Sequence, residues 1–98
     1  MNRMPYIHNF HLLQNCSSKF DLFVDFDSVY FNYSDRNSTY PLEMAAIYSV
    51  LIEDDKLYIL TKDKQLHYLH SETKEHIAID TNCYSIWSII KQIFHLNQ

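Results

Sequence analysis

The chain has 98 residues, 47% of them hydrophobic, with a formal net charge of −4 at pH 7 and no glycine. This length suits one domain, so we expect residues 1–98 to form a single compact domain, and no apolar run reaches the length of a membrane-spanning helix. The lack of glycine excludes every glycine-rich phosphate-binding loop, and the negative charge disfavours general binding to nucleic-acid backbones.

The N-terminal half is predicted to begin with a strand over residues 6–14 (YIHNFHLLQ), with a short helix as the alternative. Residues 20–27 then alternate between two faces, which predicts a half-buried strand. One face carries Phe20, Leu22, Val24 and Phe26, and the other carries Asp21, Phe23, Asp25 and Asp27. The apolar positions change parity after Ser28, so we predict a bulge or a turn near Asp27 and Ser28.

The C-terminal half contains several short apolar segments. Residues 33–39 read as a polar loop, residues 41–46 as either helix or extended chain, and residues 47–52 as a strand. The turn-forming stretches EDDK, TKDKQ and SETK separate the next apolar segments, which predicts an antiparallel meander. The run KLYILTKDKQLHYLHSETKEHI resembles one blade of a quinoprotein-type β-propeller, and this resemblance implies no function.

The last segment shows helical spacing. Ile86, Ile89, Ile90, Ile93 and Phe94 fall at positions i, i+3, i+4, i+7 and i+8, which is the pattern of an amphipathic helix. We therefore predict a two-layer α+β fold, in which an antiparallel β-sheet, with its meander in the C-terminal half, is packed by a C-terminal amphipathic α-helix.

The stretch VDFDS is the strongest candidate for a catalytic site. LFVDFDSVYF resembles the first motif of the haloacid dehalogenase phosphatases, an apolar strand that ends in Asp-x-Asp, and also the first strand of the metal-dependent NYN nucleases. The resemblance implies a metal-dependent phosphohydrolase with Asp25 as nucleophile and Asp27 as general acid/base. The simpler interpretation, which the alternation favours, is a strand that turns its acidic side chains to water.

The histidines and cysteines are weaker candidates. His67 and His70 are three apart, as are His8 and His11, so each pair would point to opposite faces of a strand but share a face on a helix. We expect His76 to meet His70 on a neighbouring strand. No cysteine stands at zinc-site spacing, so we predict no metal and no cofactor. Cys16 and Cys83 are predicted to be free thiols in a cytoplasmic protein, with a single disulfide as the alternative.

The functional hypothesis is a small non-enzymatic cytoplasmic protein that acts as an inhibitor through protein–protein contacts. Such a protein would be an immunity protein, or a phage or mobile-element protein that blocks a host defence or nucleic-acid enzyme. Aromatic anchors beside carboxylates are typical of surfaces that bind a basic protein partner, and they disfavour direct binding of nucleic acid. The predicted partner-binding residues are Asp21, Phe23, Asp25, Asp27, Asp35, Glu53, Asp54 and Asp55. The alternatives are the phosphohydrolase and a structural or adaptor subunit that forms a homodimer or larger homo-oligomer.

Overall fold

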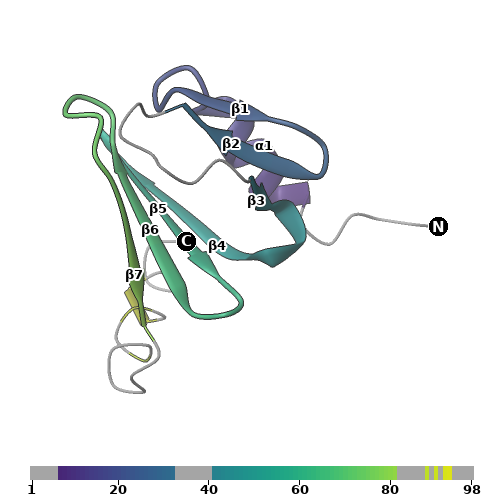
Figure 1. Ribbon diagram of the computed structural model, residues 1–98, viewed down its shortest axis with the longest axis vertical. Helices are drawn as coiled ribbons and strands as arrows, with labels where there is room; N and C mark the ends of the chain where they lie inside the picture. Colours follow the sequence, from purple (N-terminus) through teal and green to yellow (C-terminus); the bar gives the residue numbers. More distant parts are fainter. Residues whose placement is uncertain (1–6, 33–40, 82–87, 89, 91, 94–98) are drawn as a thin grey trace.

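The computed structural model describes residues 7–32, 41–81, 88, 90, 92 and 93. The elements in chain order are α1 (Ile7–Asn15), β1 (Leu22–Val24), β2 (Ser28–Phe31), β3 (Leu42–Glu43), the 3-10 helix η1 (Met44–Ala46), β4 (Ile47–Glu53), β5 (Lys56–Thr61), β6 (Gln65–His70) and β7 (His76–Asp80). The strands form two antiparallel sheets, with strand orders β1-β2-β3 and β4-β5-β6-β7 (Figure 1).

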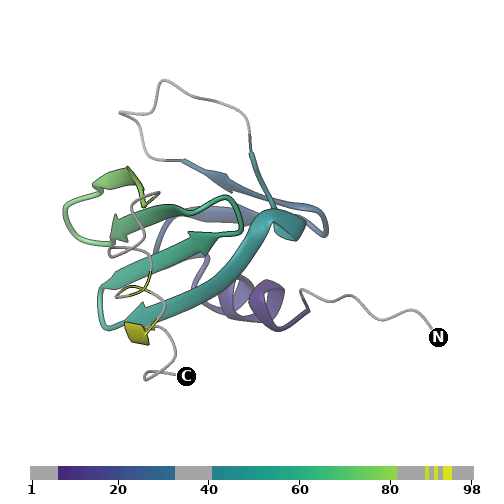
Figure 2. The ribbon, with the colours of Figure 1, turned by 90° about the horizontal axis from the view of Figure 1, so that it is seen from below.

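The predicted fold class is wrong. The described part of the chain is mostly β, and α1 lies on the N-terminal side, beside β1 and β4 (Figure 2). In the C-terminal segment only residues 88, 90, 92 and 93 are described, and they are helical. Of the predicted C-terminal apolar stripe, Ile86, Ile89 and Phe94 lie outside the described residues. Ile90 is partly buried against Leu51 and Leu60, whereas Ile93 is 46% exposed. In the main core, α1 and the smaller sheet pack against the larger sheet.

The strand predicted for residues 6–14 is also wrong, because this segment forms α1. Leu13 and, just after the end of α1, Cys16 are buried in the core, and Phe10 and Leu12 are partly buried against it. Phe10, Leu13 and Cys16 are three residues apart, which is a helical spacing. Leu13 is completely buried and packs in the same cluster as Val50 of β4. A helix thus buries these apolar side chains on one face, whereas a strand would have divided them between its two faces.

The alternation in residues 20–27 is confirmed for most positions. Phe20 and Leu22 are buried, and Asp21, Phe23, Asp25 and Asp27 are exposed. The strand is shorter than predicted, however, since β1 ends at Val24 and the chain turns before β2 begins at Ser28. The turn near Asp27 and Ser28 is therefore confirmed. Phe26, which the alternation places on the same face as Phe20 and Leu22, is 56% exposed.

The meander predicted for the C-terminal half is present as β4 to β7. Residues 41–46, left open between extended chain and helix, contain both, as β3 followed by η1. The larger sheet has an inner face, on which Val50, Leu57, Ile59 and Leu69 join the main core. Its outer face carries Leu51 and Leu60, with Tyr58, Leu66 and Ile90 packed against them.

Candidate functional site

Strand β1 and the turn that leads to β2 carry exposed aromatic and acidic side chains. Phe23 is 60% exposed and Phe26 is 56% exposed, and Asp25 and Asp27 are exposed in the same stretch of chain. We call these four residues the hairpin tip. Large aromatic side chains are costly to leave in water, so two of them, one on β1 and one in the turn that follows it, mark a surface that is suited to contact with another molecule.

Local hydrogen bonds fix the conformation of the turn. The backbone N–H of Asp25 donates to the carbonyl oxygen of Ser28 at 2.8 Å, which closes the turn. The side-chain carboxylate of Asp25 accepts a hydrogen bond from the backbone N–H of Phe26. Pairing of Phe23 with Tyr30 and of Val24 with Val29 fixes the register, and Val29 is completely buried. The tip is therefore attached to the core through β2.

Contacts with neighbouring elements hold the two exposed rings. The Phe23 ring centroid lies 5.7 Å from that of Tyr30 on β2, and the Phe26 centroid lies 6.3 Å from that of Phe10 on α1. The backbone N–H of Met44 in η1 donates to the carbonyl oxygen of Asp27 at 2.7 Å. Three elements therefore support the tip, and side chains that are already ordered lose less entropy when they bind.

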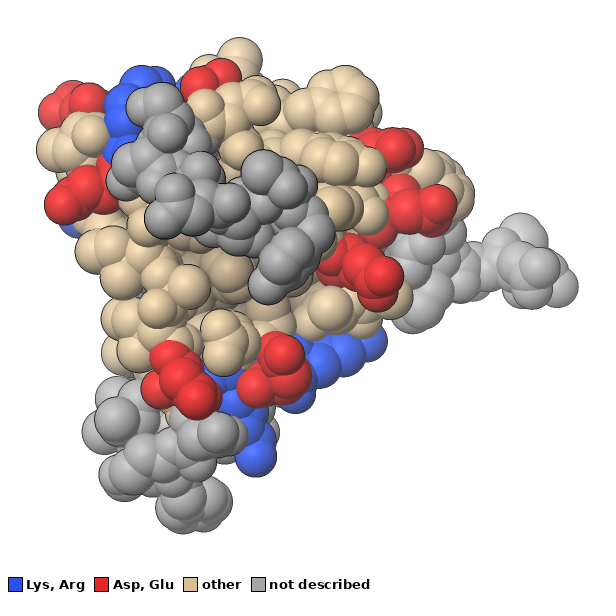
Figure 3. Space-filling model, viewed as in Figure 1, with Lys and Arg blue, Asp and Glu red and all other residues tan. Residues whose placement is uncertain are grey.

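The eight residues predicted to bind a partner are not brought together. Figure 3 shows acidic groups at several separate places, and the group on the right lies where Figure 1 draws the β1–β2 turn. The structure places Phe23, Asp25 and Asp27 on the hairpin tip. Asp21 lies at the other end of β1, where its carbonyl oxygen accepts a hydrogen bond from the N–H of Asn32. Asp35 lies outside the described residues.

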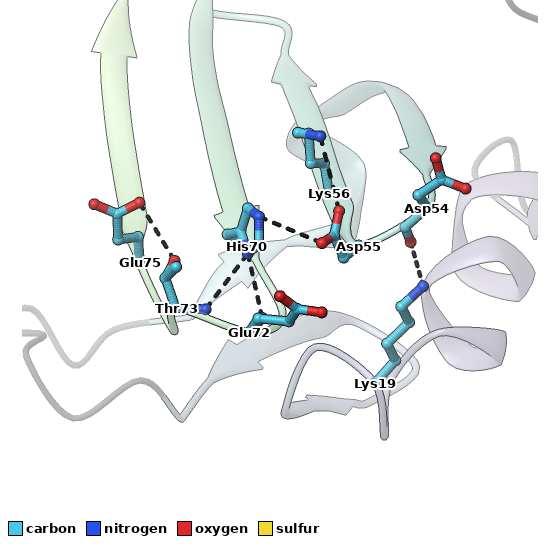
Figure 4. A network of polar contacts seen from close by, with 8 residues as sticks. All are labelled: Lys19, Asp54, Asp55, Lys56, His70, Glu72, Thr73 and Glu75. Atoms are coloured by element: carbon cyan, nitrogen blue, oxygen red, sulfur yellow. Dashed lines mark hydrogen bonds and ion pairs between the residues drawn. The ribbon is translucent and has the colours of Figure 1, made fainter.

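Of the remaining three predicted residues, Asp54 and Asp55 form the β4–β5 turn and Glu53 ends β4; contacts within the chain hold this turn (Figure 4). The Lys19 side chain donates a hydrogen bond to the carbonyl oxygen of Asp54. The Asp55 carboxylate lies 3.8 Å from Nζ of Lys56 and 3.5 Å from Nε2 of His70. Asp55 is thus partly compensated by a neighbouring positive charge, and Glu53 is exposed at the end of β4.

The Asp-x-Asp resemblance implied a different setting for Asp25 and Asp27. In the dehalogenase arrangement the first acid ends a strand of a parallel sheet, whereas here both acids lie in a turn between antiparallel strands. All strand pairs in the described residues are antiparallel. Within the same residues, no group of three or more His, Cys, Asp or Glu side chains is placed to hold a metal ion.

A second feature is a cleft of about 430 Å³ between the two sheets, which we call the intersheet cleft. It is lined by Phe31, Pro41, Leu42, Ala46, Thr61, Asp63, Gln65, His67, His76 and Ala78. Its volume lies within the usual range for sites that bind small molecules. No sequence pattern indicates this cleft, because its walls come from five strands and connecting segments that only the tertiary fold brings together.

The predicted contact between His76 and His70 is wrong. His76 was expected to meet His70, but the register places His76 opposite Leu69, so His70 points to the other face of the sheet. His76 instead meets His67, with Nε2 of His76 lying 3.0 Å from Nδ1 of His67. His67 and His70 do point to opposite faces, as predicted. His8 and His11 lie on α1, where both are exposed.

No protein-family model, curated protein or solved structure matches this chain. In the described residues, no helix has both the length and the apolar character needed to cross a membrane.

Proposed function

We propose that this chain is a small non-enzymatic protein that inhibits a protein partner, and that the hairpin tip is the centre of its contact surface. The observation that supports this proposal is the exposure of Phe23 and Phe26, at 60% and 56%, beside the exposed carboxylates of Asp25 and Asp27. The partner surface would offer apolar pockets for the two rings and basic side chains for the two acids.

The two types of side chain would contribute differently. Burying roughly 100 Å² of apolar surface on each ring would stabilise a complex by about 2–3 kcal/mol per ring, at about 25 cal/mol per Å². Carboxylates at the rim of an interface act mainly on the rate of encounter with a basic partner. The net charge of −4 acts in the same direction. On this proposal, the two rings mainly set the dissociation rate of the complex, and the two acids mainly set its association rate.

The tip forms only part of such an interface. A stable protein–protein interface buries about 800 Å² on each partner, which is more than four side chains provide. Two exposed residues follow from the contacts of the tip: His11, next in the chain to Phe10, and Glu43 on β3, which pairs with Ser28, and we assign them to the rim.

We place the chain among inhibitors such as immunity proteins, or phage and mobile-element proteins that block a host defence or nucleic-acid enzyme. Enzymes that act on nucleic acid present basic grooves, which exposed carboxylates complement. A cytoplasmic location is part of this proposal. It is supported by Cys16, which is a free, buried thiol, because reducing compartments keep cysteines in this form.

A homo-oligomeric structural subunit is the second candidate. It is favoured by Ile77 and Ile79 on β7, which are 44% and 45% exposed on the outer face of the larger sheet. Light scattering over a range of concentrations tests this alternative directly. A dimer that dissociates in the variant Ile77→Ser/Ile79→Ser would favour it, whereas a monomer at all concentrations would contradict it.

The inhibitor proposal is tested by comparing three forms of the chain as bait in a host lysate. These are the wild type, the tip variant Phe23→Ser/Phe26→Ser, and the control variant Ile77→Ser/Ile79→Ser, which removes two exposed apolar side chains elsewhere. A partner should be enriched by the wild type and the control, and at least about tenfold less by the tip variant. Its enzymatic activity should fall when the wild-type chain is added. Equal enrichment by all three baits, or unchanged activity, would contradict the proposal.

A further inference from the structure

The two histidines of the intersheet cleft are diagonal neighbours on one face of the sheet. In the antiparallel pair β6–β7, His67 lies opposite Ala78, and His76 lies opposite Leu69. Residues two apart on a strand share a face, so the side chains of His67 and His76 project from the same side. Diagonal neighbours of this kind are within reach of long and aromatic side chains. Ala78, which lies opposite His67 and two residues from His76, has a short side chain.

The imidazole nitrogens that face each other have a spacing that suits two ligands of one metal ion. Nδ1 of His67 and Nε2 of His76 are 3.0 Å apart, and the ring centroids are 5.3 Å apart. Nitrogens at this spacing, each 2.0–2.1 Å from an ion, form an angle of about 90–97° at the ion. That angle is the one between adjacent positions in the square or tetragonal geometries that Cu²⁺ and Ni²⁺ prefer.

Packing fixes the orientation of both rings. Phe31 on β2 stacks nearly parallel to His67, with 14° between the ring planes and 6.0 Å between the centroids. The same Phe31 ring lies 4.6 Å from the centroid of His76, tilted by 56°. Leu69, which is opposite His76, is completely buried. Since both imidazoles are held before any ligand arrives, little ordering would accompany metal binding.

The cleft provides room and polarity for further ligands of the ion. Its volume of about 430 Å³ exceeds what a few water molecules need. On the same wall, the Thr61 hydroxyl donates a hydrogen bond to the carboxylate of Asp63 and accepts one from the N–H of Gln65 at 2.9 Å. These contacts hold a negative charge at the edge of the cleft, and a negative charge favours a bound cation.

We propose that His67 and His76 are the two protein ligands of a divalent transition-metal ion, Cu²⁺ or Ni²⁺, in the intersheet cleft. Water or a small ligand fills the other coordination positions. This inference differs from the sequence-based prediction of no metal, and it does not depend on the hairpin tip. In the described residues no third His, Cys, Asp or Glu completes the set. The site therefore has open positions, as catalytic and ligand-binding metal sites do.

Metal binding requires a tautomer change in one ring. Without metal, one of the two facing nitrogens carries the proton and donates it to the lone pair of the other. For both nitrogens to coordinate, that proton moves to the other nitrogen of its own ring, so both imidazoles stay neutral. The change is visible in the ¹⁵N chemical shifts of His67 and His76, which is a readout that a structural histidine pair would not give.

The test is a calorimetric titration of the tag-free chain with CuCl₂ or NiCl₂ at about pH 7.5, above the usual histidine pKa of about 6.5. We expect one ion per chain. The single variants His67→Gln and His76→Gln should each weaken binding by at least about tenfold. Circular dichroism without metal reports whether each variant folds. The matched control is His8→Gln/His11→Gln, which removes two exposed histidines that share a face of α1 and should leave the affinity unchanged.

If His67→Gln and His76→Gln do not fold, the ¹⁵N spectrum of the wild type still tests the proposal. The expected result is that metal shifts or broadens the ¹⁵N signals of His67 and His76 before those of any other histidine. The inference is overturned if the first signals affected belong to other histidines, if the α1 control loses the affinity, or if no binding is detected.

Discussion

The carboxylate of Asp25 accepts a hydrogen bond from the backbone N–H of Phe26, its neighbour in the β1–β2 turn. One acid of the hairpin tip therefore shapes the turn that exposes the adjacent aromatic ring. Asp27 differs from Asp25, because its carbonyl oxygen rather than its carboxylate makes the contact to η1. The two acids of VDFDS thus have separate roles in the fold, although both are exposed.

This difference predicts unequal effects of substitution. Asp25→Ala removes the acceptor of the Phe26 N–H and should lower the free energy of unfolding by about 0.5–1 kcal/mol. Asp25→Asn keeps an acceptor oxygen and should change it by less than about 0.5 kcal/mol. Asp27→Ala is the control and should also stay within about 0.5 kcal/mol. Urea unfolding measures all three, and equal losses for Asp25→Ala and Asp27→Ala would contradict the assigned role.

The same variants test the phosphohydrolase alternative. If Asp25 and Asp27 hold a catalytic Mg²⁺ or Mn²⁺, either ion should raise the melting temperature of the wild type and not that of Asp25→Asn. On the binding-protein account, both proteins respond equally to these ions.

Because this chain has no glycine, non-glycine residues in its tight turns adopt the left-handed backbone conformation, with positive φ. Asp21, Asp54, Lys64 and Lys74 have φ values of 55°, 54°, 69° and 61°. We expect Lys64→Gly to raise the free energy of unfolding by about 0.5–1 kcal/mol. It relieves about 1–2 kcal/mol of backbone strain, against a smaller entropic cost of glycine. The backbone bonds of Lys64 to Thr61 and Thr81 remain available to glycine. Lys62→Gly in the same turn is the control and should not be stabilising.

The buried thiol of Cys16 predicts a dependence of stability on pH. Burial, the largest cause, raises the pKa of Cys16 from 9.0 to about 11, while a backbone hydrogen bond and Lys19 act in the opposite direction. Below about pH 9 the thiol is neutral in the folded and unfolded states, so its contribution to the free energy of unfolding is fully present. Between about pH 9 and 11 the unfolded state loses its proton first, and that contribution is lost.

The measurement compares wild type with Cys16→Ala by urea unfolding at several pH values. Other groups that titrate in this range are shared by the two proteins and cancel in the difference. The stability advantage of the wild type should shrink between about pH 9 and 11. An advantage that stays constant across this range would show that burial does not perturb the thiol.

Local patterns were sufficient for part of the fold. The meander β4 to β7 was predictable because each strand is a short apolar segment and each connection is a short polar one. The apolar positions change parity after Ser28, and this local pattern was sufficient to locate the β1–β2 turn. The N-terminal helix was not predictable with the same ease, because α1 has only nine residues and its apolar content suits either period.

Other features depend on tertiary information. The exposure of Phe26 was missed because the alternation of a strand was extended past Val24, where the chain already turns. The pairing of His67 with His76 depends on the register that the β6–β7 turn sets, and a shift of one residue would have placed the two rings on opposite faces. The separation of the acidic residues follows from how the two sheets are placed, and no local pattern encodes that arrangement.

The most direct test of the central claim is photo-crosslinking from the hairpin tip in a host lysate. A photoreactive phenylalanine analogue is introduced at Phe26, and in a second protein at Ile77, which is exposed on the other sheet. We predict a discrete protein adduct from position 26 that is absent from position 77 and that weakens as salt is raised from about 50 to 300 mM, since surface charges are then screened. Equal adducts from both positions, or none from position 26, would contradict the claim that the hairpin tip binds a protein partner.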